Sequence, residues 1–269
     1  MTQQTIGFIG AGNMAASLVG GMINQGIKPT RIWLGDVSQE RLTELSHQHG
    51  VQVSNDNAVI AQQADVLVLA VKPQVMQPVC AALRTALAGR QPLIISIAAG
   101  VTVGNLKSWL GDLPVVRCMP NTPALVQTGA TGLYAEPSVS AQQKALAEQI
   151  LSSVGLTFWL AEEKALDAVT AVSGSGPAYF FLLMESMIEA GCQLGLDADT
   201  SRQLVLQTAL GAAKLASSST SGPDVLRQQV TSPGGTTAAA LDTFEQGGFR
   251  QLVNNALAAA HRRSEELAG

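Results

Sequence analysis

A glycine-rich turn near the start of the chain has the clearest chemical meaning. Gly10, Gly12 and Ala15 follow the apolar residues 5–9 and fit the pattern G-x-G-x-x-A. In dinucleotide-binding proteins the first glycine permits a tight turn, the second lets the backbone approach a pyrophosphate, and the small third residue lets helix and strand pack closely. The pyrophosphate then binds to free N–H groups at the positive end of the helix. These residues therefore predict a dinucleotide site.

An acidic residue follows the next apolar stretch, residues 31–35. A carboxylate at the position of Asp36 often accepts a hydrogen bond from the adenosine ribose of NAD, whereas a nearby arginine accommodates the extra phosphate of NADP. Ser38 and Arg41 could bind such a phosphate, and Asp36 or Ser38 could instead cap the following helix. A role in cofactor binding and a role in helix capping are both open for these residues. They therefore predict NADPH or NADH without choosing between the two cofactors.

Two further apolar stretches end in residues that could face the same ligand. Lys72, which precedes Pro73, could meet a phosphate, a ribose or a substrate carboxylate as a point charge, although a solvated strand-end lysine is the commoner case. Ala98 and Ala99, before Gly100, are small enough for a nicotinamide ribose to lie against them. Tight packing explains these alanines equally well.

Two polar loops complete the candidate residues. Asn121, between Pro120 and Pro123, could position the carboxamide of a nicotinamide or a substrate, or could simply form a structural turn. Residues 232–237 (SPGGTT) place two glycines and two threonines where a helix begins. Free N–H groups and hydroxyl donors at such a place suit a carboxylate. A helix–helix turn with a threonine cap is the alternative.

Strand and helix signals alternate over the first 160 residues. Residues 66–71 are apolar without alternation, which is typical of a strand covered on both faces. Strands are expected at residues 5–9, 31–35, 51–54, 65–71, 92–98, 115–119, 132–135 and 156–160, and helices at residues 15–25, 39–48, 57–62, 74–87, 103–110 and 141–152. This alternation predicts an α/β Rossmann domain with a mainly parallel sheet, whose ligands lie beyond the carboxyl ends of the strands.

Strand signals stop after about residue 162, and helical spacing continues to the end. We expect an NAD(P)-binding domain over residues 1–162 and an all-α domain for dimerisation and substrate binding over residues 163–269. Ser175 is expected to cap a helix over residues 178–194, with Pro177 in its first turn. That helix is apolar nearly all round and must be buried, most simply by a second subunit.

Composition excludes several classes of protein. Of 269 residues, 46% are apolar and 13% charged, and the net charge of −4 without a basic run argues against nucleic acid or a membrane surface. Cys80, Cys118 and Cys192 are odd in number and widely spaced, which suits a reduced cytoplasmic protein without zinc. The beginning of the chain shows no signal-peptide pattern. Cys118 has no nearby histidine, so a thiol nucleophile is not expected.

Taken together, six segments resemble the pyrroline-5-carboxylate reductase family. The glycine turn is generic, whereas the fifth and sixth segments are specific to the family. The segments are residues 7–14 (GFIGAGNM), 70–73 (AVKP), 96–101 (SIAAGV), 117–123 (RCMPNTP), 171–179 (AVSGSGPAY) and 232–237 (SPGGTT).

The resemblance implies reduction of Δ1-pyrroline-5-carboxylate to L-proline by NADPH or NADH, the last step of proline biosynthesis. It also implies a homodimer with interlocked helical domains, which often assembles into a decamer. The implied cofactor-binding residues are Ile9, Gly10, Ala11, Gly12, Asn13, Met14, Asp36, Asn57, Ala70, Val71, Lys72, Pro73, Ala98, Ala99 and Asn121. The implied substrate-binding residues are Gly235, Thr236 and Thr237 of one subunit, with Gly174 and Ser175 of the other.

Two departures from the family qualify this picture. Asp36 stands where some members carry a serine at the ribose phosphate, and residues 221–224 (SGPD) replace a His-Pro segment of many members.

No general acid is expected, because a protonated imine is already electrophilic and orientation by Lys72 and Thr237 is the main contribution of the protein. A β-hydroxyacid-type dehydrogenase is disfavoured, since residues 178–194 contain no lysine. A non-catalytic NAD(P)-binding sensor remains the other alternative.

Overall fold

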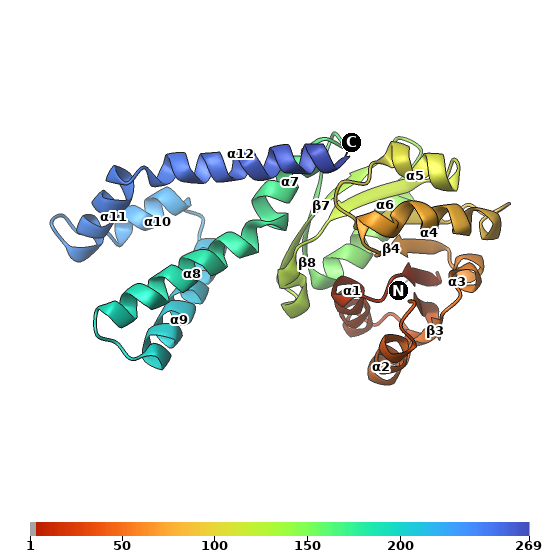
Figure 1. Ribbon diagram of the computed structural model, residues 1–269, viewed down its shortest axis with the longest axis horizontal. Coiled ribbons are helices and arrows are strands. Elements are labelled where there is room, and N and C mark those ends of the chain that lie inside the picture. Colours follow the sequence, from red (N-terminus) through yellow and green to blue (C-terminus); the bar gives the residue numbers. More distant parts are fainter. Residues whose placement is uncertain (1–3, 269) are drawn as a thin grey trace. The chain divides into compact units, whose positions relative to one another are not determined.

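The computed structural model describes residues 4–268 and separates the chain into two compact units (Figure 1). The sheet unit comprises the residues up to Ser175 and those from Ala260 onward, and the helical unit comprises Gly176–Ala259. This division lies at different residues from the expected boundary at 162, which stays a prediction.

The sheet unit contains one eight-stranded sheet in the order β3-β2-β1-β4-β5-β6-β7-β8. Its strands are β1 (Ile6–Ile9), β2 (Ile32–Gly35), β3 (Gln52–Ser54), β4 (Val66–Leu69), β5 (Leu93–Ser96), β6 (Val115–Met119), β7 (Gly129–Ala135) and β8 (Gly155–Trp159). Among the strands of residues 4–268, only β6 and β7 pair antiparallel, so the expected mainly parallel sheet is confirmed.

Helices cover both faces of the sheet, because its central strands are apolar at successive positions. Val66 and Val68 of β4 pack with α1, α2 and α6, whereas Leu67 and Leu69 pack with α3, α4 and α5. These four side chains have no exposed surface. The helices are α1 (Asn13–Asn24), α2 (Gln39–His49), α3 (Asn57–Gln63), α4 (Pro73–Ala86), α5 (Val103–Leu110) and α6 (Ala141–Leu151). The three-layer Rossmann architecture follows.

The helical unit begins inside a continuous helical run. Helix α7 (Ala165–Val169) continues through a π-helical turn, η4 (Thr170–Gly174), into α8 (Gly176–Gln193). Ser175 donates its N–H to the carbonyl of Thr170 over 2.8 Å and has helical dihedral angles. The expectation that Ser175 caps a new helix is therefore wrong. The local sequence resembles a helix start because Gly176 and Pro177 follow Ser175. The chain is nevertheless already helical at Ser175, and it passes into α8 through a π-helical turn whose hydrogen bond spans five residues.

The remaining helices of the second unit are α9 (Ala198–Ser218), α10 (Pro223–Gln229), α11 (Thr236–Gln246) and the first part of α12 (Phe249–Ala268). Phe180, Phe181 and Leu182 of α8 are 65%, 62% and 63% exposed in the single chain. Three consecutive helical residues point in directions about 100° apart, so much of the circumference of α8 is apolar and uncovered. No helix within residues 4–268 is both long and apolar enough to cross a bilayer.

Two adjacent glycines of α1 meet different surroundings. A Cβ at Gly21 would lie 2.5 Å from the carbonyl oxygen of Ser153, whereas a Cβ at Gly20 would meet only His49, at 3.5 Å. Gly21 therefore lets α1 approach the turn η3 (Ser152–Val154) closely.

We expect Gly21→Ala to lower the free energy of unfolding by about 1–3 kcal/mol, because the backbone of Ser153 cannot move aside. Gly20→Ala should raise it by about 0.5–1 kcal/mol, because alanine favours the helix. Urea denaturation of both variants measures the difference, and stabilisation by both would contradict the close packing of α1 on η3.

Candidate functional site

The carboxyl ends of four strands meet at one edge of the sheet. Gly10 donates its N–H to the carbonyl of Gly35 over 2.8 Å, and Ala70 donates to Ile9 over 2.8 Å. The N–H of Ile97 reaches the carbonyl of Leu69 at 3.2 Å. The segments that follow β1, β2, β4 and β5 are thereby brought together, as the sequence predicts for a ligand site.

The glycine turn has the geometry that a diphosphate requires. Gly10 has φ +100°, and a Cβ there would lie 2.7 Å from the carbonyl oxygen of Ala70. Gly12 is exposed, has no neighbour within 4 Å of a Cβ position, and stands at the N-cap of α1 without a side-chain hydrogen bond. The N–H groups of the first turn of α1 are thus left for an anion. The residues present fit a dinucleotide.

Asp36 holds the glycine turn in place. Its Oδ2 accepts a hydrogen bond from the N–H of Ala11 at 2.8 Å, and its Oδ1 accepts one from the N–H of Ser38 at 3.0 Å. The Ser38 hydroxyl accepts from the N–H of Arg41, so Ser38 is the residue that caps α2. Both carboxylate oxygens of Asp36 therefore accept hydrogen bonds from the backbone, and its expected contact with an adenosine ribose stays a prediction.

Arg41 and Asn57 lie at the same end of β2. Arg41 donates from Nε to the carbonyl of Ala11 at 3.1 Å, and its Nη1 lies 2.6 Å from Oε2 of Glu44. A pair so exposed contributes about 0–1 kcal/mol, so Glu44 does not fix Arg41. Asn57 begins α3, and its Oδ1 would lie 2.7 Å from a Cβ at Gly35. Asn57 therefore covers the end of β2 beside Asp36.

The ends of β4 and β5 supply residues with different exposure. Lys72 is exposed at the N-cap of α4, and Pro73 occupies the first position of that helix. Ala98 is buried and Ala99 half-buried, and the N–H of Ala98 lies 3.4 Å from the hydroxyl of Ser96. Lys72 is thus available to a ligand, and its role stays a prediction.

The side-chain amide of Asn121 is hydrogen-bonded to two other segments of the chain. Its Nδ2 donates to the carbonyl of Ser173 at 3.1 Å, and its Oδ1 accepts from the N–H of Ala130 at 2.9 Å. Both ends of the amide are thereby engaged. Asn121 joins the end of β6 to the π-helical turn that carries Gly174, and π-turns of this kind are frequent at functional sites.

The segment 232–237 lies in the helical unit and forms the start of α11. Gly234 has φ +68°, and Gly235 is the N-cap without a side-chain hydrogen bond. The interpretation as a threonine cap is therefore wrong. Thr236 is exposed and Thr237 half-buried, and the first N–H groups of α11 are left for a carboxylate. Binding of a substrate there stays a prediction.

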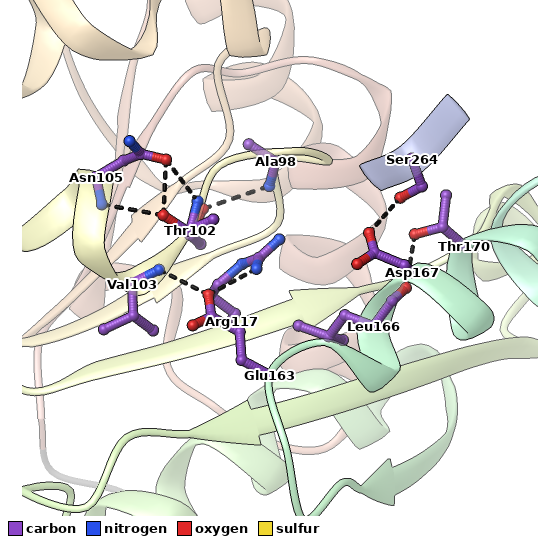
Figure 2. A network of polar contacts seen from close by, with 11 residues as sticks. Ala98, Thr102, Val103, Asn105, Arg117, Glu163, Leu166, Asp167, Thr170 and Ser264 are labelled. Carbon is purple, nitrogen blue, oxygen red and sulfur yellow. Dashed lines mark hydrogen bonds and ion pairs between the residues drawn. The ribbon is translucent and has the colours of Figure 1, made fainter. Parts of the chain in front are cut away.

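One polar cluster was not expected from the sequence. Arg117 of β6 pairs with Glu163, Nη1 to Oε1 at 2.7 Å, and the same carboxylate oxygen accepts the N–H of Val103 at 2.7 Å (Figure 2). Arg117 is 8% exposed. The signal was an arginine inside an apolar strand, since a buried guanidinium requires a carboxylate partner.

The cysteines and histidines suggest no further chemistry. Burial raises the pKa of the Cys118 thiol, outweighing the nearby Arg117, and burial raises the pKa of Cys80 to about 12. Neither thiol is therefore activated as a nucleophile. Burial, and then the charge of Arg41, lower the pKa of His49. Within residues 4–268, no three histidine, cysteine or acidic residues are grouped to hold a metal ion.

Comparison with known proteins gives the same picture over the whole chain. Residues 163–267 match the family model described as pyrroline-5-carboxylate reductase dimerisation, and residues 5–100 match that described as NADP oxidoreductase coenzyme F420-dependent. The pyrroline-5-carboxylate reductase of Pseudomonas aeruginosa is 54% identical over 269 residues, covering 100% of this chain and 98% of the relative. That of Glycine max is 40% identical, covering 98% and 96%.

Solved structures agree. A pyrroline-5-carboxylate reductase from Coxiella burnetii has a TM-score of 0.95 at 45% identity, covering 100% of both chains. The Plasmodium falciparum enzyme with NADP bound has a TM-score of 0.88 at 32% identity, again covering 100% of both chains. The chain therefore belongs to the pyrroline-5-carboxylate reductase family of NAD(P)H-dependent oxidoreductases of proline biosynthesis.

Proposed function

We propose that this chain reduces Δ1-pyrroline-5-carboxylate to L-proline with NADPH or NADH. The observation that carries the proposal is a pair of helices, α1 and α11, that each begin at a glycine without a side-chain cap. One helix start suits a diphosphate and the other a small carboxylate. These are the two anionic groups of the cofactor and the imine acid.

The proposed cofactor-binding residues come from the segments at the carboxyl edge of the sheet. The first turn of α1 binds the diphosphate, Lys72 adds a positive charge, and the small side chains after β5 leave room for a ribose. The full set is Ile9, Gly10, Ala11, Gly12, Asn13, Met14, Asp36, Asn57, Ala70, Val71, Lys72, Pro73, Ala98, Ala99 and Asn121.

The proposed substrate-binding residues hold and orient the imine acid. When bound, the nicotinamide supplies a hydride. Gly235, Thr236 and Thr237 bind the substrate carboxylate, and Gly174 and Ser175 of a second copy of the chain lie opposite. Because the protonated imine carbon is already electrophilic, orientation is the main contribution of the protein, worth up to roughly 7–11 kcal/mol when the geometry is good. Lys72 and Thr237 provide this orientation.

The family match to a dimerisation region supports oligomerisation. We propose a homodimer, because the exposed apolar surface of α8 would be buried by a second copy of the chain. The family resemblance is the basis for proposing that such dimers can assemble into a decamer. The three cysteines are free thiols, which supports a reducing compartment, and we propose the cytoplasm.

Purified protein should oxidise both NADPH and NADH when Δ1-pyrroline-5-carboxylate is added, and should release proline. Absorbance of the reduced nicotinamide at saturating substrate measures both rates in one assay. Omitting the imine acid provides the control. Cofactor binding without turnover would support the non-catalytic sensor instead.

Thr237→Ala should raise the KM for the imine acid about tenfold or more, because a hydrogen bond to a charged group is worth about 1.5–3 kcal/mol. The KM for the cofactor should stay within about twofold. Thr243→Ala is the matched control, since Thr243 lies in the same helix and its hydroxyl bonds the carbonyl of Ala239. A larger effect on the cofactor than on the substrate would overturn the assignment of Thr237.

Gly12→Asp should weaken NADPH binding while leaving the fold intact. Aspartate is a favourable N-cap, and a Cβ at Gly12 meets no neighbour within 4 Å. In water, two like unit charges 4 Å apart repel each other by about 1 kcal/mol. The new carboxylate would repel both charges of the diphosphate, and the resulting loss of about 2 kcal/mol corresponds to about 30-fold weaker binding. Fluorescence titration measures the affinity, and Asn24→Asp at the far end of α1 is the control. Unchanged affinity would exclude the first turn of α1 as the diphosphate site.

A further inference from the structure

Glu163 connects three segments of the sheet unit through a single carboxylate. Its Oε1 lies 2.7 Å from Nη1 of Arg117 in β6 and 2.7 Å from the N–H of Val103, the first residue of α5 (Figure 2). The Arg117 side chain is 10% exposed and that of Glu163 28%. A carboxylate at the positive end of a helix and beside a largely buried guanidinium is stabilised by both.

The first of these segments is the loop between β5 and α5, which contains Ala98 and Ala99. The loop ends at Thr102, whose hydroxyl caps α5 in a reciprocal arrangement with Asn105. Glu163 fixes the next N–H group. Gly100, at φ +71°, lies so near the end of α12 that a Cβ would be 2.8 Å from the carbonyl oxygen of Leu267. The loop is therefore held at its end by Glu163 and packed against α12 at Gly100.

The second segment leads from Glu163 through α7 to the turn that carries Ser173, Gly174 and Ser175. Arg117 holds the beginning of this segment, and Asn121 holds its end through the carbonyl of Ser173. Both anchors therefore come from β6 or from the residues directly after it. Between them α7 lies close to the sheet, where a Cβ at Gly132 would be 2.9 Å from Val169.

We propose that Glu163, paired with Arg117, is a positioning residue for hydride transfer. It fixes the loop that would lie under the nicotinamide ribose and, at the same time, the segment that leads to Gly174 and Ser175. This inference rests on the proposed function of both segments. Glu163 touches neither ligand and acts through the backbone of Val103 and the side chain of Arg117.

A matched control lies at the other end of α5. Lys107 pairs with Glu136, Nζ to Oε2 at 2.6 Å, and the Glu136 side chain is 8% exposed. Glu136 also accepts a hydrogen bond from Ser138, and Lys107 pairs with Asp112 at 2.7 Å. Glu136→Gln therefore removes a paired carboxylate that is more deeply buried than Glu163 and bonds to the same helix through Lys107 of its last turn.

Glu163→Gln should lower kcat about tenfold or more, since a displacement of about 1 Å can cost roughly 100-fold in rate. The Kd for NADPH, measured by fluorescence titration, and the KM for the imine acid should change less than about threefold, because the binding contacts remain. Glu136→Gln should lower the Tm at least as much, because Glu136 is the more buried of the two, and should leave kcat within about twofold. A kcat for Glu163→Gln equal to that of Glu136→Gln would overturn the proposal.

The double variant Glu163→Gln with Arg117→Gln separates positioning from stability. Removing both charges avoids an unpaired buried guanidinium, so the Tm should recover relative to Glu163→Gln alone. The value of kcat should stay low, because β6 no longer holds the segment. Recovery of kcat together with the Tm would show a purely structural role and overturn the inference.

Two further comparisons complete the design. Should Glu163→Gln not yield folded protein, Glu163→Asp replaces it, since it keeps the charge and shortens the side chain by one methylene, and the same split between kcat and binding is expected. The unaltered protein is assayed in parallel. Absence of turnover there contradicts the proposed function itself, whereas normal turnover with an unaffected Glu163 variant contradicts only the positioning role.

Discussion

The backbone of Gly10 passes so close to the carbonyl of Ala70 that no side chain fits between them, with 2.7 Å left to a Cβ position. This approach occurs because β1 lies between β2 and β4, and the N–H groups of Gly10 and Ala70 continue the hydrogen bonds of the sheet beyond the strands. A positive φ at Gly10 then turns the chain directly into α1. The position of the free helix start, and with it the proposed diphosphate site, depends on this one contact.

The elements of the sheet unit could be predicted closely because their signals are local. The bounds of β6 and α5 agree with the expected residues 115–119 and 103–110, since an apolar strand and a capped amphipathic helix are each specified by their own residues. Strand β7 begins at Gly129, three residues before the expected start. Its first residues, Gly129 and Ala130, have little strand propensity and are drawn into the sheet by pairing with β8.

The difference between local and long-range signals also explains which parts of the candidate site could be predicted. The glycine turn and the glycines before α11 were identified because their chemistry is contained within a few consecutive residues. Asn121 was identified as a polar residue in a rigid loop, yet the two partners of its amide are 52 and 9 residues away and could not be read from the sequence. Glu163 and Arg117 are 46 residues apart, and only the fold brings them together. The backbone geometry of the proposed binding segments was thus predictable, whereas the side chains that hold these segments were not.

The helix N-termini fall into two groups, those capped by a side chain and those left without such a cap. Side chains cap α2, α3, α5, α6 and α9, through Ser38, Asp56, Thr102, Ser140 and Asp197. Helices α1, α4 and α11 instead begin at Gly12, Lys72 and Gly235, none of which caps with its side chain, and each of them starts at a segment assigned here to a ligand. Helix α10, which begins at Gly222 followed by Pro223, shows that an uncapped start alone does not identify a site. Glycine at an N-cap costs only a few tenths of a kcal/mol relative to serine or aspartate, so the free N–H groups of α1 and α11 hardly weaken the fold. An anion that binds there completes the helix, and binding and local stability therefore reinforce each other.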